Sequence, residues 1–150
     1  MDDLMFEMVT LGSRGYCCSQ ILMILALKER SAENPDLVRA MAGLCRGGGT
    51  CRGPCGVLTG AACVIALYAA KGAVDETESE RLPLMIDTLN EWFAETAGSA
   101  FGGTACGDIL GEVDCRAADP SRCGQVLVDT CQKVWEILEE NGFDLSGSDD

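Results

Sequence analysis

Apolar residues recur along this chain with the three- and four-residue spacing of amphipathic helices. Residues 2–11 show this spacing, and residues 17–30 are apolar on nearly all sides until their charged end, as in a buried helix. No segment has the alternation of β-branched and polar residues that is typical of a strand. The pattern therefore predicts an all-α fold, a compact bundle of five to six helices.

Start and stop signals place the remaining helices. Asn34 directly before Pro35 is a strong helix start, because the asparagine can cap and proline suits the first turn. Pro83 either kinks the fifth helix or marks its true first turn. The expected helices are residues 2–11, 17–30, 36–44, 56–71, 75–97 and about 119–141. The fourth of them, rich in glycine and alanine, is predicted to be the central helix.

The length and the net charge of the chain limit its number of domains and its possible partners. The 150 residues predict a single domain over residues 1–142, followed by a flexible acidic tail over residues 143–150. The net charge of −13 argues against nucleic acid and against an anionic membrane surface as partners. No apolar run is long enough to span a bilayer. An acidic surface instead suits a basic redox partner protein, and a homodimer is left open.

The ten cysteines indicate thiol or metal chemistry. Met1-Asp2-Asp3 lacks the basic segment that opens a signal peptide, so we expect a cytoplasmic protein whose thiols stay reduced. The chain contains no histidine. This excludes mixed cysteine–histidine zinc sites, attached haem with an axial histidine, and a cysteine–histidine nucleophile. Any chemistry therefore depends on cysteine.

Two glycine-rich segments contain cysteines. The first, residues 43–60, holds Cys45, Cys51 and Cys55 and leads into the predicted central helix. Cys55 therefore falls at a helix start, where free N–H groups and the helix dipole favour a thiolate. The second, residues 98–111, surrounds Cys106. Glycine allows a backbone to approach a ligand closely, so both segments are candidate binding loops.

Arginines lie beside many of these cysteines. Five of the chain's arginines are adjacent to a cysteine or three residues from one: Arg14, Arg46, Arg52, Arg116 and Arg122. Positive neighbours lower the pKa of a thiol and offset the charge of a thiolate-ligated cluster. The alternative is that arginines and these cysteines simply share loops.

The order of four motifs resembles a known family. The motifs are GYCCSQ at residues 15–20, CGVLTGA at 55–61, CGDILG at 106–111 and the cysteine that opens the last helix. They are similar to the motifs of the redox-active family that is named for its C_GCAxxG_C_C pattern. This family also resembles part of the split-Soret cytochromes. The resemblance implies that Cys18, Cys55, Cys106 and Cys123 are the recurring cysteines. It also implies that they can hold an iron–sulfur cluster, with a two-iron form favoured.

We therefore expect an iron–sulfur redox protein that acts in electron transfer or redox sensing. One alternative is a metal-free thiol–disulfide protein that uses Cys51 with Cys55 or Cys17 with Cys18. Another is a cysteine-rich zinc or copper protein. Whether the protein is an enzyme stays open.

The other cysteines depart from the family pattern, which usually has Asn where Cys17 stands. Cys17, Cys45, Cys51 and Cys115 are candidate additional ligands. Cys115 or Cys131 could replace Cys123 as the fourth ligand. Cys17, Cys45 and Cys51 are expected close to the site, as a reactive dithiol or as further ligands, and Cys63 is expected to be a packing residue.

Overall fold

The computed structural model describes residues 2–111 and 121–147, and over these residues the protein is built from helices. The helices of seven or more residues are α1 (Asp2–Ser13), α2 (Cys18–Glu29), α3 (Pro35–Met41), α5 (Gly56–Ala69), α6 (Leu82–Phe93) and α9 (Ser121–Glu140). No strand forms in the described ranges. The prediction of an all-α bundle of five to six helices is confirmed.

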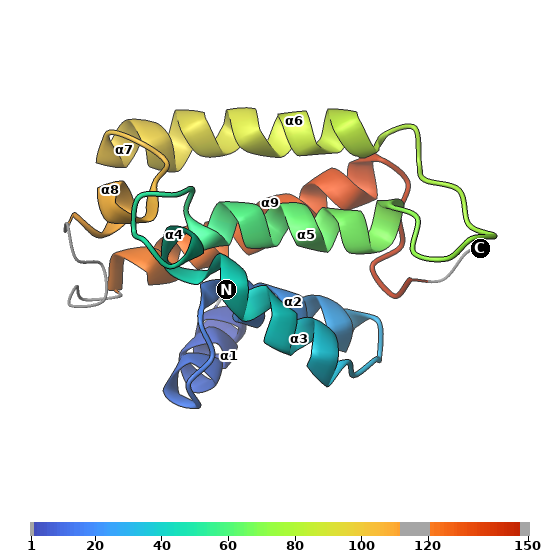
Figure 1. Cartoon of the computed structure of the whole chain (residues 1–150), viewed down its shortest axis with the longest axis horizontal. Helices are drawn as coiled ribbons and strands as arrows, with labels where there is room; N and C mark the ends of the chain where they lie inside the picture. The colour runs from blue at the N-terminus through green and yellow to red at the C-terminus, as the bar shows by residue number, and fades with distance from the viewer. Residues whose placement is uncertain (1, 112–120, 148–150) are drawn as a thin grey trace.

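Helix α5 lies at the centre of the bundle and packs against α2, α6 and α9 (Figure 1). Val57, Ala61, Val64 and Ile65 on α5 are at most 1% exposed. The predicted central helix therefore has the expected place. The apolar composition of α5 suggests burial on all sides, but one side is only partly covered, since Ala62, Cys63 and Ala66 are half-buried.

Short helices gather at one end of the molecule, on the left in Figure 1. They are α4 (Cys45–Gly48), α7 (Ser99–Phe101) and α8 (Cys106–Leu110), with the 3-10 turn η1 (Ala42–Leu44) and the π-helical turn η2 (Ala94–Gly98). Both glycine-rich segments belong to this end. Helix α5 contacts α4 and α9 contacts α8, and the Cys18 sulfur at the start of α2 lies against Gly56 at the start of α5, so longer helices also begin at this end.

The predicted fifth helix begins later than the sequence suggested. Residues 75–81 form turns, and α6 starts at Leu82 with Pro83 in its first turn. The side chain of Glu76 accepts hydrogen bonds from the N–H groups of Gly72 and Ala73, at 2.6 and 2.9 Å. This acidic segment is exposed and buries no apolar stripe, so it gains nothing by becoming helical.

The chain after α9 continues along the bundle. The Tyr68 hydroxyl donates to the Leu145 carbonyl at 2.6 Å, and the Phe143 side chain packs on the core. The division into a domain over residues 1–142 and a flexible tail stays a prediction. None of the described helices combines the length and apolar character that a membrane crossing requires.

Gly60 lets α2 and α5 approach closely. A Cβ at this position would lie 2.9 Å from the Ser19 Cα atom, which belongs to α2. We predict that Gly60→Ala destabilises the iron-free protein by about 1–2 kcal/mol, because overpacking costs about 1–3 kcal/mol and exceeds the helix-propensity gain of about 1 kcal/mol. Urea denaturation followed by circular dichroism measures the change.

Gly124 provides the matched control. It also lies within a helix, α9, but a Cβ there would meet no atom within 4 Å. Gly124→Ala should therefore stabilise the protein by up to about 1 kcal/mol. Equal effects of the two substitutions would contradict the close contact between α2 and α5.

Candidate functional site

Four cysteines lie at the starts of four different helices. Cys18 and Cys106 are the first residues of α2 and α8, Cys123 lies in the first turn of α9, and Cys55 directly precedes α5. First-turn N–H groups have no partner inside the helix and carry the positive end of its dipole. Each position is therefore suited to an anionic sulfur. We call these four residues the cysteine quartet.

The structure brings the quartet together. The Cys18 thiol interacts electrostatically with Cys55, Cys106 and Cys123. Cys55 and Cys106 interact with each other, and Cys123 interacts with both of them, so every pair in the quartet is coupled. All four are free thiols. A Cβ on Gly56 would lie 3.0 Å from the Cys18 Sγ atom, so this sulfur rests against the start of α5.

Pairing between the two glycine-rich segments aligns two quartet members. The Cys55 N–H donates to the Thr104 carbonyl at 2.8 Å, and the Cys106 N–H donates to the Gly53 carbonyl at 3.1 Å. The two bonds flank an isolated antiparallel β-bridge. Segments about fifty residues apart in sequence thus hold Cys55 and Cys106 close together.

The first glycine-rich segment adopts a left-handed backbone. All residues from Arg46 to Gly49 have positive φ, between 57° and 93°. A Cβ on Gly47 would lie 2.6 Å from the Gly53 carbonyl oxygen and 3.2 Å from the Cys106 Cβ atom. Glycine at position 47 is therefore required both by the backbone conformation and by the close approach to Cys106.

Burial raises the pKa of every quartet thiol. The pKa values of Cys18 and Cys123 rise from 9.0 to about 12. Burial is the largest cause, and the neighbouring quartet thiols raise the pKa further. The N–H groups of Val57 and Leu58 oppose this rise at Cys55. Without a cation the quartet is therefore protonated at neutral pH, and a bound cation would be needed to hold four thiolates.

Arg46 supplies a positive charge beside the quartet. Its guanidinium lowers the pKa of Cys106 and Cys123, against the larger effect of burial. The other arginines singled out in the sequence have different positions. Arg14 lines a groove between α1 and α3, and Arg52 is exposed. Arg116 and the side chain of Arg122 lie outside the described parts of the structure.

Removing the Arg46 charge is predicted to slow alkylation of two cysteines. In Arg46→Ala the pKa of Cys106 and Cys123 rises further, so less thiolate is present at pH 8. Iodoacetamide should then modify both in the iron-free protein about two- to fivefold more slowly, as expected for one water-screened charge. Mass spectrometry of the alkylated peptides measures the rates. Arg52→Ala is the control and should leave them unchanged; equal slowing in both variants would contradict the assignment.

Three of the candidate additional ligands, Cys17, Cys45 and Cys51, are not free thiols in this form of the protein. Cys17 and Cys45 form a disulfide with Cα atoms 6.2 Å apart. Cys51 is also disulfide-bonded and lies buried against Cys106. Cys17, Cys45 and Cys51 are therefore not available here as thiolate ligands. The pairs suggested for exchange, Cys51 with Cys55 and Cys17 with Cys18, do not form, and the partner of Cys17 is Cys45.

Three further cysteines were considered in the sequence. Cys131 is buried in α9, where burial and the neighbouring Glu29 and Glu7 raise its pKa to about 12. No quartet cysteine is among the charges that shift the pKa of Cys131, whereas Cys123 interacts with Cys18, Cys55 and Cys106. Cys63 is a half-buried free thiol within α5. Cys115 lies outside the described residues.

The quartet does not have the geometry of a site for one ion. Within residues 2–111 and 121–147, no group of three or more His, Cys, Asp or Glu side chains is arranged to hold a metal ion. The quartet is therefore not arranged as a site for a single metal ion. A cluster of several irons distributes its thiolates over different metal atoms, so it does not require such an arrangement.

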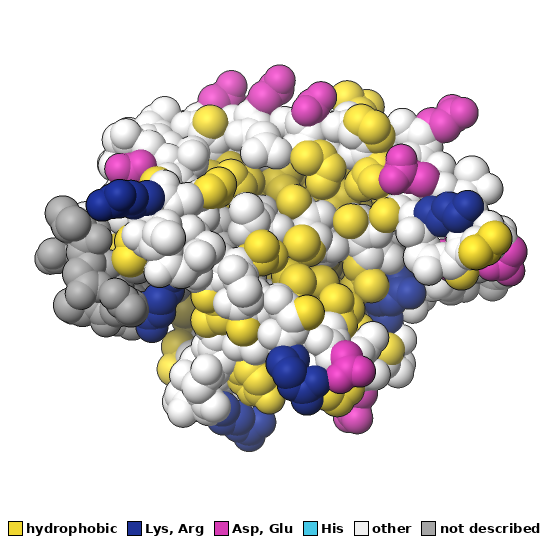
Figure 2. Space-filling model, in the orientation of Figure 1, with side chains coloured by type: hydrophobic (Ala, Val, Ile, Leu, Met, Phe, Trp, Pro, Cys, Tyr) yellow, Lys and Arg dark blue, Asp and Glu magenta, His cyan; other side chains and the backbone are white. Residues whose placement is uncertain are grey.

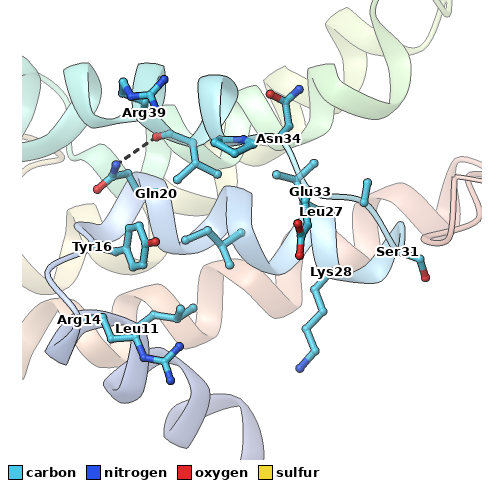
Figure 3. Close-up of a pocket in the computed structure, with 14 residues that line it drawn as sticks. Leu11, Arg14, Tyr16, Gln20, Leu27, Lys28, Ser31, Glu33, Asn34 and Arg39 are labelled. Carbon is cyan, nitrogen blue, oxygen red and sulfur yellow. Dashed lines mark hydrogen bonds between the residues drawn. The ribbon is translucent and has the colours of Figure 1, made fainter.

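A groove on the described surface lies elsewhere. It has a volume of about 900 Å³ and runs along α2 between α1 and α3 (Figure 3). Apolar side chains line it together with the charged side chains of Arg14, Lys28, Glu33 and Arg39. Lys28 pairs with Glu7 at 3.0 Å and Arg39 with Asp36 at 2.7 Å. Gln20 lines the same groove and also reaches Cys17, which is adjacent to the quartet.

The helical fold and the four neighbouring free thiols define a cysteine-rich, all-α protein. The family described as "Putative redox-active protein (C_GCAxxG_C_C)" matches residues 16–137, and the chain belongs to this family. The recognition made from the sequence motifs is thereby confirmed. Comparison with curated proteins and with solved structures gave no match.

Proposed function

We propose that this protein binds an iron–sulfur cluster through Cys18, Cys55, Cys106 and Cys123 and acts in one-electron transfer or redox sensing. The observation that supports this most is the division among the cysteines. The quartet consists of free thiols that interact in every pair, while Cys17 and Cys45 are bonded to each other. The family analogy favours a two-iron cluster.

The residues of the quartet fit such a group. The donor set is four thiols with no histidine in the chain, as in all-cysteine cluster sites. The backbone N–H groups of Val57 and Leu58 lower the pKa of Cys55, and that of Ser19 lowers the pKa of Cys18. These donors stabilise thiolates, and hydrogen bonds to cluster sulfurs raise the reduction potential. A cluster, when bound, supplies the one-electron chemistry.

The surface charge favours a basic redox partner protein. Exposed carboxylates from Asp87, Glu91 and Glu95 belong to α6 and its π-helical extension, and acidic side chains line that edge of the molecule in Figure 2. Complementary charge increases the rate of encounter more than it increases affinity. A basic electron-transfer partner would therefore dock faster at low ionic strength.

Anaerobic purification followed by iron, sulfide, zinc and copper analysis tests the proposal. Iron and sulfide in equal amounts, with a charge-transfer absorption band, are expected. A colourless protein that contains zinc or copper would show that the quartet holds another metal. A colourless protein without metal would favour thiol–disulfide chemistry, for which the disulfide between Cys17 and Cys45 is the specific observation.

A further inference from the structure

We propose that the disulfide between Cys17 and Cys45 is a second redox site, at which a dithiol reductant exchanges with the protein through the Cys17 sulfur. Both residues lie outside the recurring cysteines of the family. Cys17 directly precedes the proposed ligand Cys18, but neither sulfur of the disulfide is a proposed ligand, and the exchange itself does not require a bound metal.

The two sulfurs differ in access. Cys17 is half-buried in the turn that enters α2, directly after the exposed Tyr16. Cys45 is only 9% exposed. Exchange requires an incoming thiolate to reach one sulfur while the other leaves. The geometry therefore makes Cys17 the sulfur that is attacked and Cys45 the leaving group.

Two neighbours of Cys17, Tyr16 and Gln20, line the groove of Figure 3. Gln20 accepts a hydrogen bond from the Cys17 N–H at 3.2 Å, and its Oε1 atom lies 3.5 Å from the Cys17 sulfur. Figure 3 shows Tyr16 and Gln20 side by side at one end of this groove. Gln20 is fixed in this place by donating to the Val38 carbonyl at 3.1 Å.

Ser19 lies beside the Cys45 sulfur, which is the leaving group. This residue is fully buried, its hydroxyl donates to the Met41 carbonyl at 2.8 Å, and its oxygen lies 2.9 Å from the Cys45 sulfur. While the disulfide is intact, the Cys45 sulfur carries no hydrogen to donate. After reduction, the Cys45 thiol can donate to the Ser19 oxygen, and Ser19 keeps its bond to Met41. The buried serine thus provides a hydrogen-bond partner for the reduced form.

The exchange balances as follows. A thiolate of the reductant bonds to the Cys17 sulfur, the bond between the two protein sulfurs breaks, and its electron pair stays on Cys45, which takes up a proton. The second thiol of the reductant then attacks the reductant's first sulfur, which is bonded to Cys17 in the mixed disulfide. This attack releases Cys17 as a thiol. Two electrons and two protons pass from the dithiol to the protein, and the reductant leaves as a disulfide.

Differential alkylation of the folded protein tests this site. Protein is treated anaerobically with dithiothreitol, quenched in acid, alkylated and mapped by mass spectrometry, while circular dichroism reports folding. Cys17 and Cys45 should become labelled together in the folded protein. Iron-containing and iron-free fractions are treated separately, and equal behaviour is expected, so that failure of the cluster assignment does not affect the result. Labelling only after unfolding would overturn the proposal.

Two further measurements test the direction of attack and the role of Ser19. Glutathione should form a mixed disulfide with Cys17 in preference to Cys45, and the reverse preference would overturn the assignment. Ser19→Ala should shift the equilibrium with dithiothreitol about fivefold toward the disulfide, the equivalent of one ordinary hydrogen bond in the reduced form. Thr130→Val removes another fully buried hydroxyl, which lies in α9, and should not shift this equilibrium. Equal shifts in both variants would rule out the role of Ser19. If Ser19→Ala does not fold, the glutathione map still decides the direction of attack.

Discussion

Replacing Cys55 with serine is expected to remove most of the iron from the anaerobically purified protein. Cys55 stands at the start of the central helix, where the backbone N–H groups of Val57 and Leu58 lower the pKa of its thiol, and it interacts with each of the other quartet thiols. Loss of a group that merely supports a metal ligand already lowers affinity about 10- to 100-fold, so loss of a ligand should cost at least that much.

The control for this variant is Cys63→Ser. Cys63 is a free, half-buried thiol in the same helix and has no quartet member among the causes of its raised pKa. It should retain its iron, sulfide and absorption spectrum. Full iron retention in Cys55→Ser, or equal loss in both variants, would refute the assignment of the quartet as the metal site.

Phe93→Ala should produce the largest loss of stability. Phe93 ends α6, is 0% exposed, and precedes the π-helical turn that leads to the second glycine-rich segment. Truncating a buried phenylalanine to alanine costs about 3–5 kcal/mol, since apolar contacts are lost and a cavity remains. Urea denaturation of the iron-free protein measures the change in the free energy of unfolding.

Leu84→Ala in the same helix is the matched control. Leu84 is 61% exposed, so its truncation should change the free energy of unfolding by less than about 0.5 kcal/mol. A loss below about 1 kcal/mol in Phe93→Ala would mean that α6 does not pack on the core as described. Because α6 contacts both α5 and α9, such a result would also question the position of Cys123.

The helices were predictable because their causes are local. Asn34 accepts from the Leu37 N–H at 3.1 Å and Pro35 occupies the first turn, as the sequence indicated for α3. The apolar character of residues 56–71 was enough to place α5 at the centre. For α6, the interpretation of Pro83 as part of the true first turn is confirmed. The start at Asp75 is wrong, because charges suited to a helix dipole do not form a helix where no apolar stripe is buried.

The sequence by itself placed Cys18, Cys55 and Cys123 near helix starts and Cys106 in a glycine-rich segment, while the short helix α8 that begins at Cys106 was not predicted. Capping, glycine content and helical periodicity are properties of short segments, and the family motifs mark Cys18, Cys55, Cys106 and Cys123 residue by residue. That these four are the ligands of a cluster stays a prediction. The absence of histidine and the excess of acidic residues also come directly from the composition.

Only the tertiary structure decided which cysteines meet. Cys17 and Cys45 are 28 residues apart, and the spacing of ten cysteines does not reveal their pairing. Their contact depends on the packing of α2 against the segment that follows α3. The approach of Cys55 to Cys106 likewise depends on a β-bridge between two glycine-rich segments. Such contacts form when distant segments bury a common core, and no local pattern in the sequence encodes them.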